Sequence, residues 1–368
     1  MKRMTPRAIA IASILFLLAP APSLGQELVL DEVETLKARV VEVLHEDVRP
    51  VPGTNVETIF QSIRAEILEG AQKGEVVSID NDYLALEVGE VFYLRHTTNS
   101  LDGTDLYSVA DPYRLPVLAF LGALFLAVVL YFGGKQGARG LLALAGSLFF
   151  IVVLLLPGIL KGYPPVLVAM GVASLIVVLG SYVTHGFNKT TTTAVFGMVL
   201  TIVLTGVLAY AAIALARLSG FSADEAIYLN FNTGGSIDIA GLLLAGILIG
   251  TLGVLYDAAI GQAVAVEELA SAGQHLSRSE VYSRALRIGR EHVGALVNTL
   301  AIAYVGAALP LLLLFYGFGS DSILLALNRE IFATEIVRTL VGSIGIVLTV
   351  PITTAISTRM LVRYHRPA

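Results

Sequence analysis

The chain has 368 residues, of which 55% are hydrophobic and only 14% charged, and its mean hydropathy is +0.78. This composition excludes an ordinary soluble globular protein and is typical of a protein that crosses a membrane several times. The absence of cysteine excludes disulfides, thiolate metal sites and cysteine nucleophiles, and the formal net charge of −5 gives no reason to expect a nucleic-acid partner.

The first segment, residues 1–25, has the pattern of a secretory signal peptide. Basic residues precede a short apolar run, and small residues lie three and one positions before Gln26. We expect cleavage after Gly25, with an uncleaved membrane anchor as the alternative. In either case the chain that follows is exported, so residues 26–114 are expected outside the inner (cytoplasmic) membrane of the cell.

Residues 26–114 are the only long hydrophilic stretch, and apolar residues recur in it with period two. Glycines separate the runs, and Asp102-Gly103 is a favourable hairpin turn. The alternating runs are Val41/Val43, Ile63/Ala65/Ile67, Val77/Ile79, Leu84/Leu86/Val88 and Phe92/Leu94. The pattern predicts a small exported β-rich domain of five or six short strands, OB-like or SH3-like. A helix with Ile59, Ile63 and Ile67 on one face is the alternative for that segment.

One cluster in this domain, His45-Glu46-Asp47, has the composition of a metal site. Successive side chains of a strand point to opposite faces, so these three cannot converge on one ion, and no metal is expected. The domain also lacks an acid–base–nucleophile set. We expect a platform for a protein partner, or a cap over the membrane part, in preference to an enzyme.

After Arg114, seven apolar windows each approach the ~20 residues that cross a hydrocarbon core. They predict a polytopic α-helical membrane protein with about seven transmembrane helices in residues 115–368. The predicted spans are 115–133, 139–156, 164–183, 191–215, 238–260, 293–315 and 334–358. Ten lysines and arginines fall in loops assigned to the cytoplasm and three in external loops. By the positive-inside rule, this bias predicts a cytoplasmic C-terminus.

Residues 261–292 are predicted to form the one sizeable cytoplasmic connection. Ser277 and Glu280 have the spacing of a capping box, at the start of a short basic amphipathic helix with Val281 and Ala285 on its apolar side. Such a helix fits on the anionic headgroups of membrane lipids. A solvated linker that carries topology signals is the alternative.

The fifth predicted span carries a row of small residues that contains an acid. Gly246, Gly250, Gly253 and Asp257 recur at intervals of three or four, so they line one helical face. We expect another helix to pack closely on this face, and Asp257 to face protein or water instead of lipid. Two roles remain possible for Asp257: a functional carboxylate, or an acid at the membrane interface that merely reaches water.

A second acid, Asp238, lies at the start of the same span, two residues after the predicted cap Ser236. There a carboxylate faces the positive end of the helix dipole, which is enough to explain it. Asp238 and Asp257 are about 28 Å apart along a helix. Two catalytic aspartates must share one site, so an intramembrane aspartyl protease is not expected, and no catalytic residue is assigned.

The fourth predicted span carries Thr193, Gly197, Thr201 and Thr205 at intervals of four. Hydroxyls in such a row either bond across a helix interface, line a polar path, or bond back to their own helix. Asn298 adds a polar side chain to the sixth predicted span.

On these residues the chain resembles the YibE/F family of bacterial multi-spanning membrane proteins. The best-matching stretches are Asp238-Ile-Ala-Gly241, the glycine row with Asp257, and the run that begins at Gln262 and reads QAVAVEEL. Supporting matches lie at Asp111-Pro-Tyr-Arg114 and in the loop that follows Lys135. The resemblance implies a multi-spanning architecture. It implies no activity, because the family has no established one.

Two functions follow as expectations. The first is permease-like transport of a small solute or ion, with Asp257 and the threonine row in the path. The second is a membrane-anchored receptor or scaffold whose exported domain binds a protein partner. Membrane lipids are the expected surroundings, a homo-oligomer stays open, and neither a cofactor nor a nucleic-acid partner is expected. The candidate residues for a polar path or helix interface are Asp257, Asp238, Gly246, Gly250, Gly253, Gln262, Thr201, Thr205 and Asn298.

Overall fold

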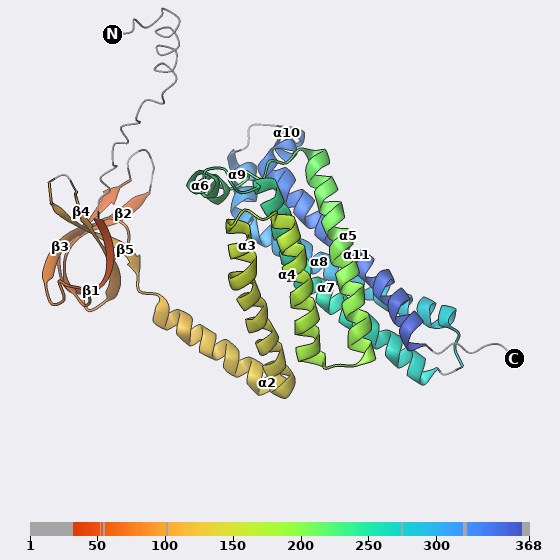
Figure 1. Ribbon diagram of the computed structural model, residues 1–368. Coiled ribbons are helices and arrows are strands. Elements are labelled where there is room, and N and C mark those ends of the chain that lie inside the picture. The colour runs from red at the N-terminus through yellow and green to blue at the C-terminus, as the bar shows by residue number, and fades with distance from the viewer. Residues whose placement is uncertain are drawn as a thin grey trace, which may run out of the picture. The chain divides into compact units, whose positions relative to one another are not determined.

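The computed structural model describes residues 32–362, except 52, 54, 55, 101, 274 and 319–321. The predicted signal peptide therefore lies outside the described residues. The chain divides into two compact units, Met1–Ala123 and Leu124–Ala368, and each is described by itself (Figure 1).

The first unit contains a five-stranded antiparallel sheet in the order β3-β2-β1-β4-β5, curled into half a barrel (Figure 1). The strands are β1 (Glu32–Pro50), β2 (Glu57–Ile67), β3 (Val76–Asn81), β4 (Val91–Thr98) and β5 (Asp105–Pro112). This confirms the β-rich domain, while the choice between an OB-like and an SH3-like barrel stays a prediction. The segment 84–88 is not a strand, although Leu86 is buried in the core of this unit.

The inward face of β1 differs from the prediction. Val41 is 46% exposed, whereas Val40 and Ala38 are buried. The pairing of β1 with β2 shifts between Val40 and Glu42, which marks a β-bulge. A bulge reverses the side on which later residues point. The period-two pattern therefore found the strand, and of its two valines Val43 packs against the core while Val41 does not.

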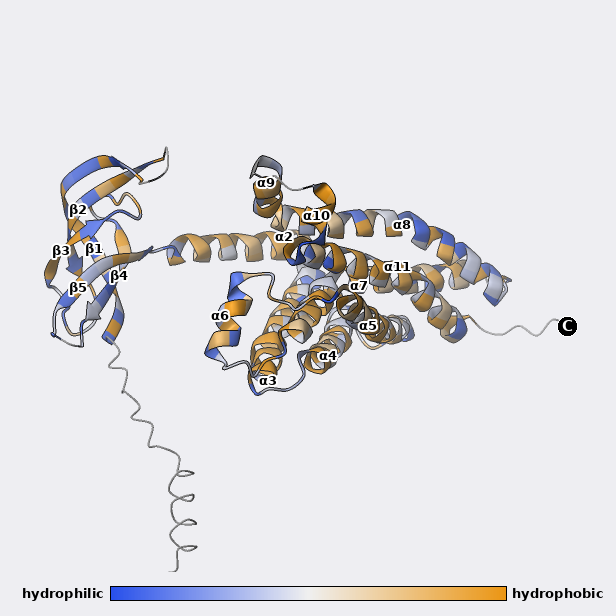
Figure 2. Ribbon diagram, turned by 90° about the horizontal axis from the view of Figure 1, so that it is seen from above, coloured by the Kyte–Doolittle hydropathy of each residue, from blue (hydrophilic) through white to orange (hydrophobic). Residues whose placement is uncertain are grey.

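The second unit is helical, and α2 leads into it. The helices are α2 (Leu115–Phe150), the π-helical turn η1 (Ile151–Leu155), α3 (Leu156–Leu160), α4 (Pro165–His185), α5 (Lys189–Ala216), α6 (Asp224–Asn232), α7 (Ile239–Ala272), α8 (Arg278–Ala307), α9 (Leu309–Phe318), α10 (Ile323–Asn328) and α11 (Glu330–Leu361). Among the described residues, five helical stretches are long and apolar enough to cross a membrane, or six if α8 and α9 form one bent span. Figure 2 shows α3, α4 and α5 hydrophobic along most of their length, as a membrane protein requires.

One of these stretches, Leu115–Leu160, has 46 residues. At roughly 1.5 Å per residue it is about 69 Å long, more than twice the ~30 Å hydrocarbon core. Its backbone is non-helical at Gly134 (φ 52°, ψ −135°), between the predicted spans 115–133 and 139–156. This break favours two spans here, although the total of seven stays a prediction. A second break bends α9 by 64° from α8 beside Pro310, where a kink is expected.

The predicted long loop 261–292 is wrong in extent. Helix α7 continues to Ala272 and α8 begins at Arg278, so only residues 273–277 connect them. The predicted capping box of Ser277 and Glu280 is present. The hydrophilic start of α8 (Figure 2) buries Val281 and Ala285 against Val266 and Val362, not on lipid. Hydropathy marks only the apolar part of a helix, and α7 and α8 both continue into polar residues.

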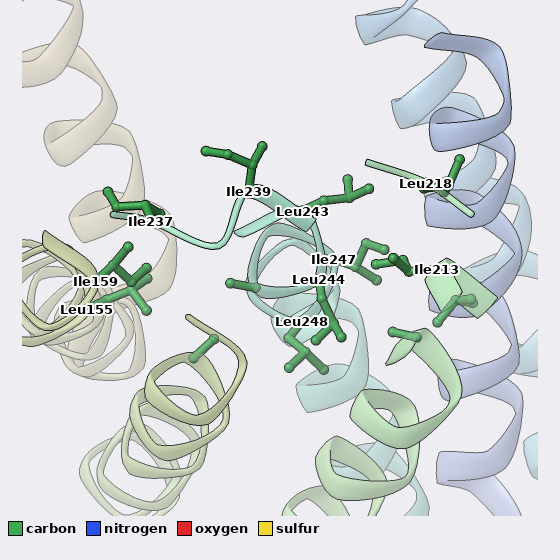
Figure 3. Packing of buried hydrophobic residues seen from close by; sticks show 14 of the residues in the cluster. Leu155, Ile159, Ile213, Leu218, Ile237, Ile239, Leu243, Leu244, Ile247 and Leu248 are labelled. Atoms are coloured by element: carbon green, nitrogen blue, oxygen red, sulfur yellow. The ribbon is translucent and has the colours of Figure 1, made fainter. Parts of the chain in front are cut away.

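Helix α7 is the centre of the second unit, because α4, α5, α8 and α11 all pack on it. Its first turns project Leu243, Leu244, Ile247 and Leu248 into an apolar cluster with residues of α3 and α5 (Figure 3). This packing fixes how α7 is rotated about its own axis. It thereby decides which of its faces is left uncovered.

Candidate functional site

The face of α7 that carries Gly246, Gly250, Gly253 and Asp257 is the exposed one. A Cβ atom at Gly250 would lie 2.8 Å from the Tyr304 hydroxyl oxygen, whereas one at Gly246 or Gly253 would meet no described atom within 4 Å. Within the described residues a neighbouring helix approaches closely at Gly250 alone, so close packing along the rest of the row stays a prediction. The glycine face is therefore largely uncovered by the described residues, and at Gly250 the Tyr304 side chain of α8 closes on it.

Asp257 lies in a cavity of about 330 Å³ between α7 and α8. His292 and Leu296 of α8 line the cavity with it, and Val350 of α11 also contributes. Within the described part of the chain, the Asp257 carboxylate has no hydrogen bond and no ion pair. An acid on a long apolar helix is thus left free to act on whatever enters the cavity.

Gln262 forms another wall of the same cavity and is 4% exposed. Its side-chain Nε2 donates a hydrogen bond of 2.8 Å to the backbone carbonyl of Ala285 in α8. Gly289 lies beside it, where a Cβ would come within 2.5 Å of Gln262 Oε1. A buried amide bonded across two helices, at a contact that only glycine fits, holds α7 and α8 at a fixed separation.

The threonine row lies elsewhere, buried between α5 and α11. Gly197 faces Thr353, Gly345 faces Thr205, and Ser357 Oγ donates to Thr193 Oγ1 at 2.9 Å. This antiparallel register sets Thr201 against Thr349. The row is therefore a helix–helix interface of small and hydroxyl-bearing residues, one of the three alternatives.

Some hydroxyls of this interface bond back to their own helix, and two have no hydrogen-bond partner among the described residues. Thr201 Oγ1 donates to the carbonyl of Gly197 at 2.8 Å, and Thr193 Oγ1 donates to that of Thr190, so both bond back to their own helix. Thr205 Oγ1 and Thr353 Oγ1 are buried with no hydrogen-bond partner among the described residues. The two unpartnered hydroxyls are those that face a glycine.

The structure thus brings together some candidates and separates others. Asp257 and Gln262 share one cavity, while Thr201 and Thr205 lie in an interface on the buried side of the helices. Because the two groups are separated, Asp257 and the threonine row do not line one common path. Asn298 is exposed on α8 and does not line the cavity.

Asp238 has a structural role at the start of α7. It is itself the N-cap of α7, and its Oδ1 accepts a hydrogen bond of 2.9 Å from the backbone N–H of Gly241. The predicted cap, Ser236, lies outside the helix. A carboxylate at this position satisfies an unpaired backbone donor and faces the positive helix end, so no further role is needed.

Sequence reasoning did not find His292, which lines the Asp257 cavity, or Tyr304, which closes on Gly250 of α7. Each lies on α8, more than thirty residues from Asp257 in the chain. The only available signal was the apolar periodicity of residues 293–315, which gives no information about the neighbouring helix.

The cavity, the glycine row and the α5–α11 interface all fall within a region shared with other proteins. The sequence profile of the YibE/F-like protein family matches residues 121–363. The chain belongs to the YibE/F family. The match covers the YibE/F helical unit and leaves the sheet outside it, although the resemblance also included Asp111–Arg114. No curated protein and no solved structure matches the chain.

Proposed function

We propose that this YibE/F-family protein is a permease-like transporter of a small solute or ion, and that the cavity beside Asp257 is where the solute binds. The observation that supports this most is the unpartnered carboxylate in a cavity on a long apolar helix. A carboxylate at membrane depth costs several kcal/mol unless it is paired or wet, so such residues mark substrate or ion pathways.

The position of Asp257 along α7 indicates at which end of the span the proposed binding cavity lies. Helix α7 has 34 residues, and Asp257 is about 27 Å from its first residue, near the far boundary of a ~30 Å core. With the proposed cytoplasmic C-terminus, the cavity opens close to the cytoplasmic face. The walls there include His292 and Gln262, which add a titratable group and an amide to the carboxylate.

The proposal is tested by the thermal unfolding of the purified full-length chain against a panel of ions and small solutes. A bound solute raises Tm by mass action. We expect at least one solute to raise the Tm of the wild type and not that of Asp257→Asn. Glu267→Gln is the matched control, because Glu267 is an exposed acid of the same helix that does not line the cavity.

A receptor or scaffold is the second candidate, and an arm of the sheet supports it. Beyond residue 40, β1 pairs only with β2, and this hairpin exposes Leu44 (50%), Val48 (55%) and Val56 (62%). Apolar side chains on a projecting hairpin suit a protein partner. Loss of function in Val48→Lys together with full function in Asp257→Asn would favour this candidate over transport.

A further inference from the structure

The loop between β3 and β4, residues 82–90, exposes several apolar side chains on the surface of the first unit. Tyr83 is 59% exposed and Val88 is 65% exposed, and Leu84 is exposed as well. Leu86 of the same loop points the other way and is buried in the core of the unit. A single exposed apolar side chain is ordinary, but several on one short loop indicate a contact surface.

Two buried amides fix the shape of this loop. Asn81 accepts a hydrogen bond of 3.1 Å from the backbone N–H of Tyr83 and donates one of 2.6 Å to the carbonyl of Leu84. Gln61 accepts one of 2.8 Å from the backbone N–H of Leu86. The two amides are also bonded to each other, at 3.2 Å. Because buried amides must keep their partners, these bonds hold the loop backbone in one conformation.

The position of the loop relative to the membrane follows from Arg114, the last residue before α2. The apolar helical stretch Leu115–Leu160 begins immediately after it. One residue spans at most ~3.6 Å of chain, and the headgroup layer on each side of the hydrocarbon core is about 5–7 Å thick. With the predicted span 115–133 in the membrane, the backbone of Arg114 therefore lies in a headgroup layer.

Tyr83 reaches this same level, because its side chain contacts Arg114. The Arg114 guanidinium lies 2.8 Å from Asp111 Oδ1, and the Tyr83 hydroxyl interacts with the same guanidinium. A second ring, that of Tyr113, precedes Arg114 in the chain and packs edge-on against Tyr93, with 5.6 Å between ring centres. Tyrosine is enriched at membrane–water boundaries, since its ring is apolar and its hydroxyl polar.

We infer that the loop 82–90 is a membrane-contact surface, and that Tyr83 lies in the headgroup layer around the start of α2. The partner is the lipid bilayer itself. Asp82 and Glu87 lie in the same loop, so the contact depends on aromatic and apolar side chains and not on attraction to anionic lipid. The inference is independent of the transport proposal and requires only that the first span begins at Leu115.

Such a contact gives the sheet a second attachment to the membrane, in addition to the chain connection into α2. A unit held only by one connecting segment is free to rotate about it, whereas a second attachment restricts that rotation. The arm formed by β1 and β2 belongs to the same unit, so its orientation to the membrane is restricted as well.

Fluorescence of an introduced tryptophan tests this inference, because the chain has no tryptophan of its own. Tyr83→Trp and Leu106→Trp are compared in the full-length protein, reconstituted into vesicles of phosphatidylcholine with or without bromine on the acyl carbons nearest the headgroup. Leu106 is the matched control, since it is 61% exposed and lies about 20 Å along β5 from Pro112. We expect brominated lipid to remove much of the emission of Tyr83→Trp and to leave that of Leu106→Trp unchanged.

Iodide in the surrounding water separates the remaining outcomes. We expect it to quench Leu106→Trp more strongly than Tyr83→Trp. Quenching of Tyr83→Trp by iodide and not by brominated lipid would show that the loop faces water. Protection from both quenchers would show that a protein, such as a second copy, covers the loop. Either result would overturn the inference, as would equal quenching of the two variants by brominated lipid. If Tyr83→Trp lowers Tm, Leu84→Trp in the same loop takes its place.

Discussion

The side chain of Thr205 on α5 packs directly on Gly345 of α11, close enough that a Cβ on the glycine would lie 2.5 Å from Thr205 Oγ1. Two turns along, the arrangement is reversed, and Thr353 of α11 packs on Gly197 of α5. The small residue of one helix thus receives the threonine of the other. Because lipid offers no hydrophobic driving force between helices, such close packing holds the pair together.

This interface gives the first prediction. Gly345→Val should destabilise the protein by about 1–3 kcal/mol, because the added methyl groups overlap Thr205 in a filled interface. Thr205→Val keeps the shape and removes only a buried hydroxyl without a partner, so it should leave Tm unchanged or raise it. Thermal unfolding of the purified variants measures both. A Thr205→Val protein as unstable as Gly345→Val would show that the hydroxyl contributes more than shape.

The second prediction concerns the amide that joins α7 to α8. Gln262→Leu removes the hydrogen bond to the Ala285 carbonyl and should cost about 1–3 kcal/mol. Val264→Leu, at an exposed position two residues away, is the control and should be neutral. Comparison of the two melting temperatures decides the matter. Equal values would mean that the buried amide contributes nothing to the contact of the two helices.

The glycine row of α7 provides a third prediction with an internal control. Gly250→Leu should lower the amount of folded protein in the membrane, because its side chain collides with Tyr304. Gly253→Leu adds the same bulk where a Cβ meets no described atom within 4 Å, so its abundance should be normal. Quantitative blotting of membrane fractions compares them. If Gly253→Leu is equally depleted, something outside this chain, such as a second copy, covers the row.

The fourth prediction concerns how the stability of the β-sheet unit depends on pH. Hydrogen bonds from His96 and then Thr98 lower the pKa of Asp105, and the distance from His96 Nε2 to Asp105 Oδ1 is 2.8 Å. A carboxylate whose pKa is lower in the folded state stabilises the fold above its unfolded pKa of about 3.9. That stabilisation is lost as pH falls through the lower, folded value.

Residues 26–112 should therefore lose stability on acidification below about pH 4, and the loss should be smaller in Asp105→Asn. Melting curves followed by circular dichroism at several pH values measure this difference. Parallel pH profiles for the two proteins would contradict the assigned role of Asp105.

Topology is the fifth prediction and rests on the distribution of basic residues. Reporter fusions after Lys135 and Arg284 should lie in the cytoplasm, and fusions after Lys161 and Asp224 should be exported. The break at Gly134 beside the first of these sites makes it the most informative. An exported reporter at Lys135 would mean that Leu115–Leu160 crosses the membrane once, not twice.

Much of this architecture could be predicted from residue patterns, because burial imposes periodicity. The period-two run at Ile63, Ala65 and Ile67 became the core face of β2. The bulge after Val40 could not be predicted, because no residue type marks it and it depends on the partner strand. The same limit applies to the ends of α7 and α8, whose outer turns are set by contacts between helices.

For a related reason, only one part of the candidate site, the contribution of α7, could be predicted from the sequence. An acid on a glycine face is a local pattern, so Asp257 could be found from α7 alone. The side chains that form a cavity with it, His292 and Leu296, come from a helix whose rotation depends on Gln262 and Gly289. Which parts of the glycine face another helix covers is likewise a tertiary property.

The most direct test of the central claim is solute flux in proteoliposomes that contain the wild type or Asp257→Asn at equal density. The solute is one that raises the Tm of the wild type. Asparagine nearly preserves the shape of aspartate and removes its charge, so insertion and abundance should be normal. We predict that flux through Asp257→Asn falls to the level of empty liposomes, while Glu267→Gln retains it. Flux through Asp257→Asn equal to that of the wild type would contradict a transport path at this carboxylate.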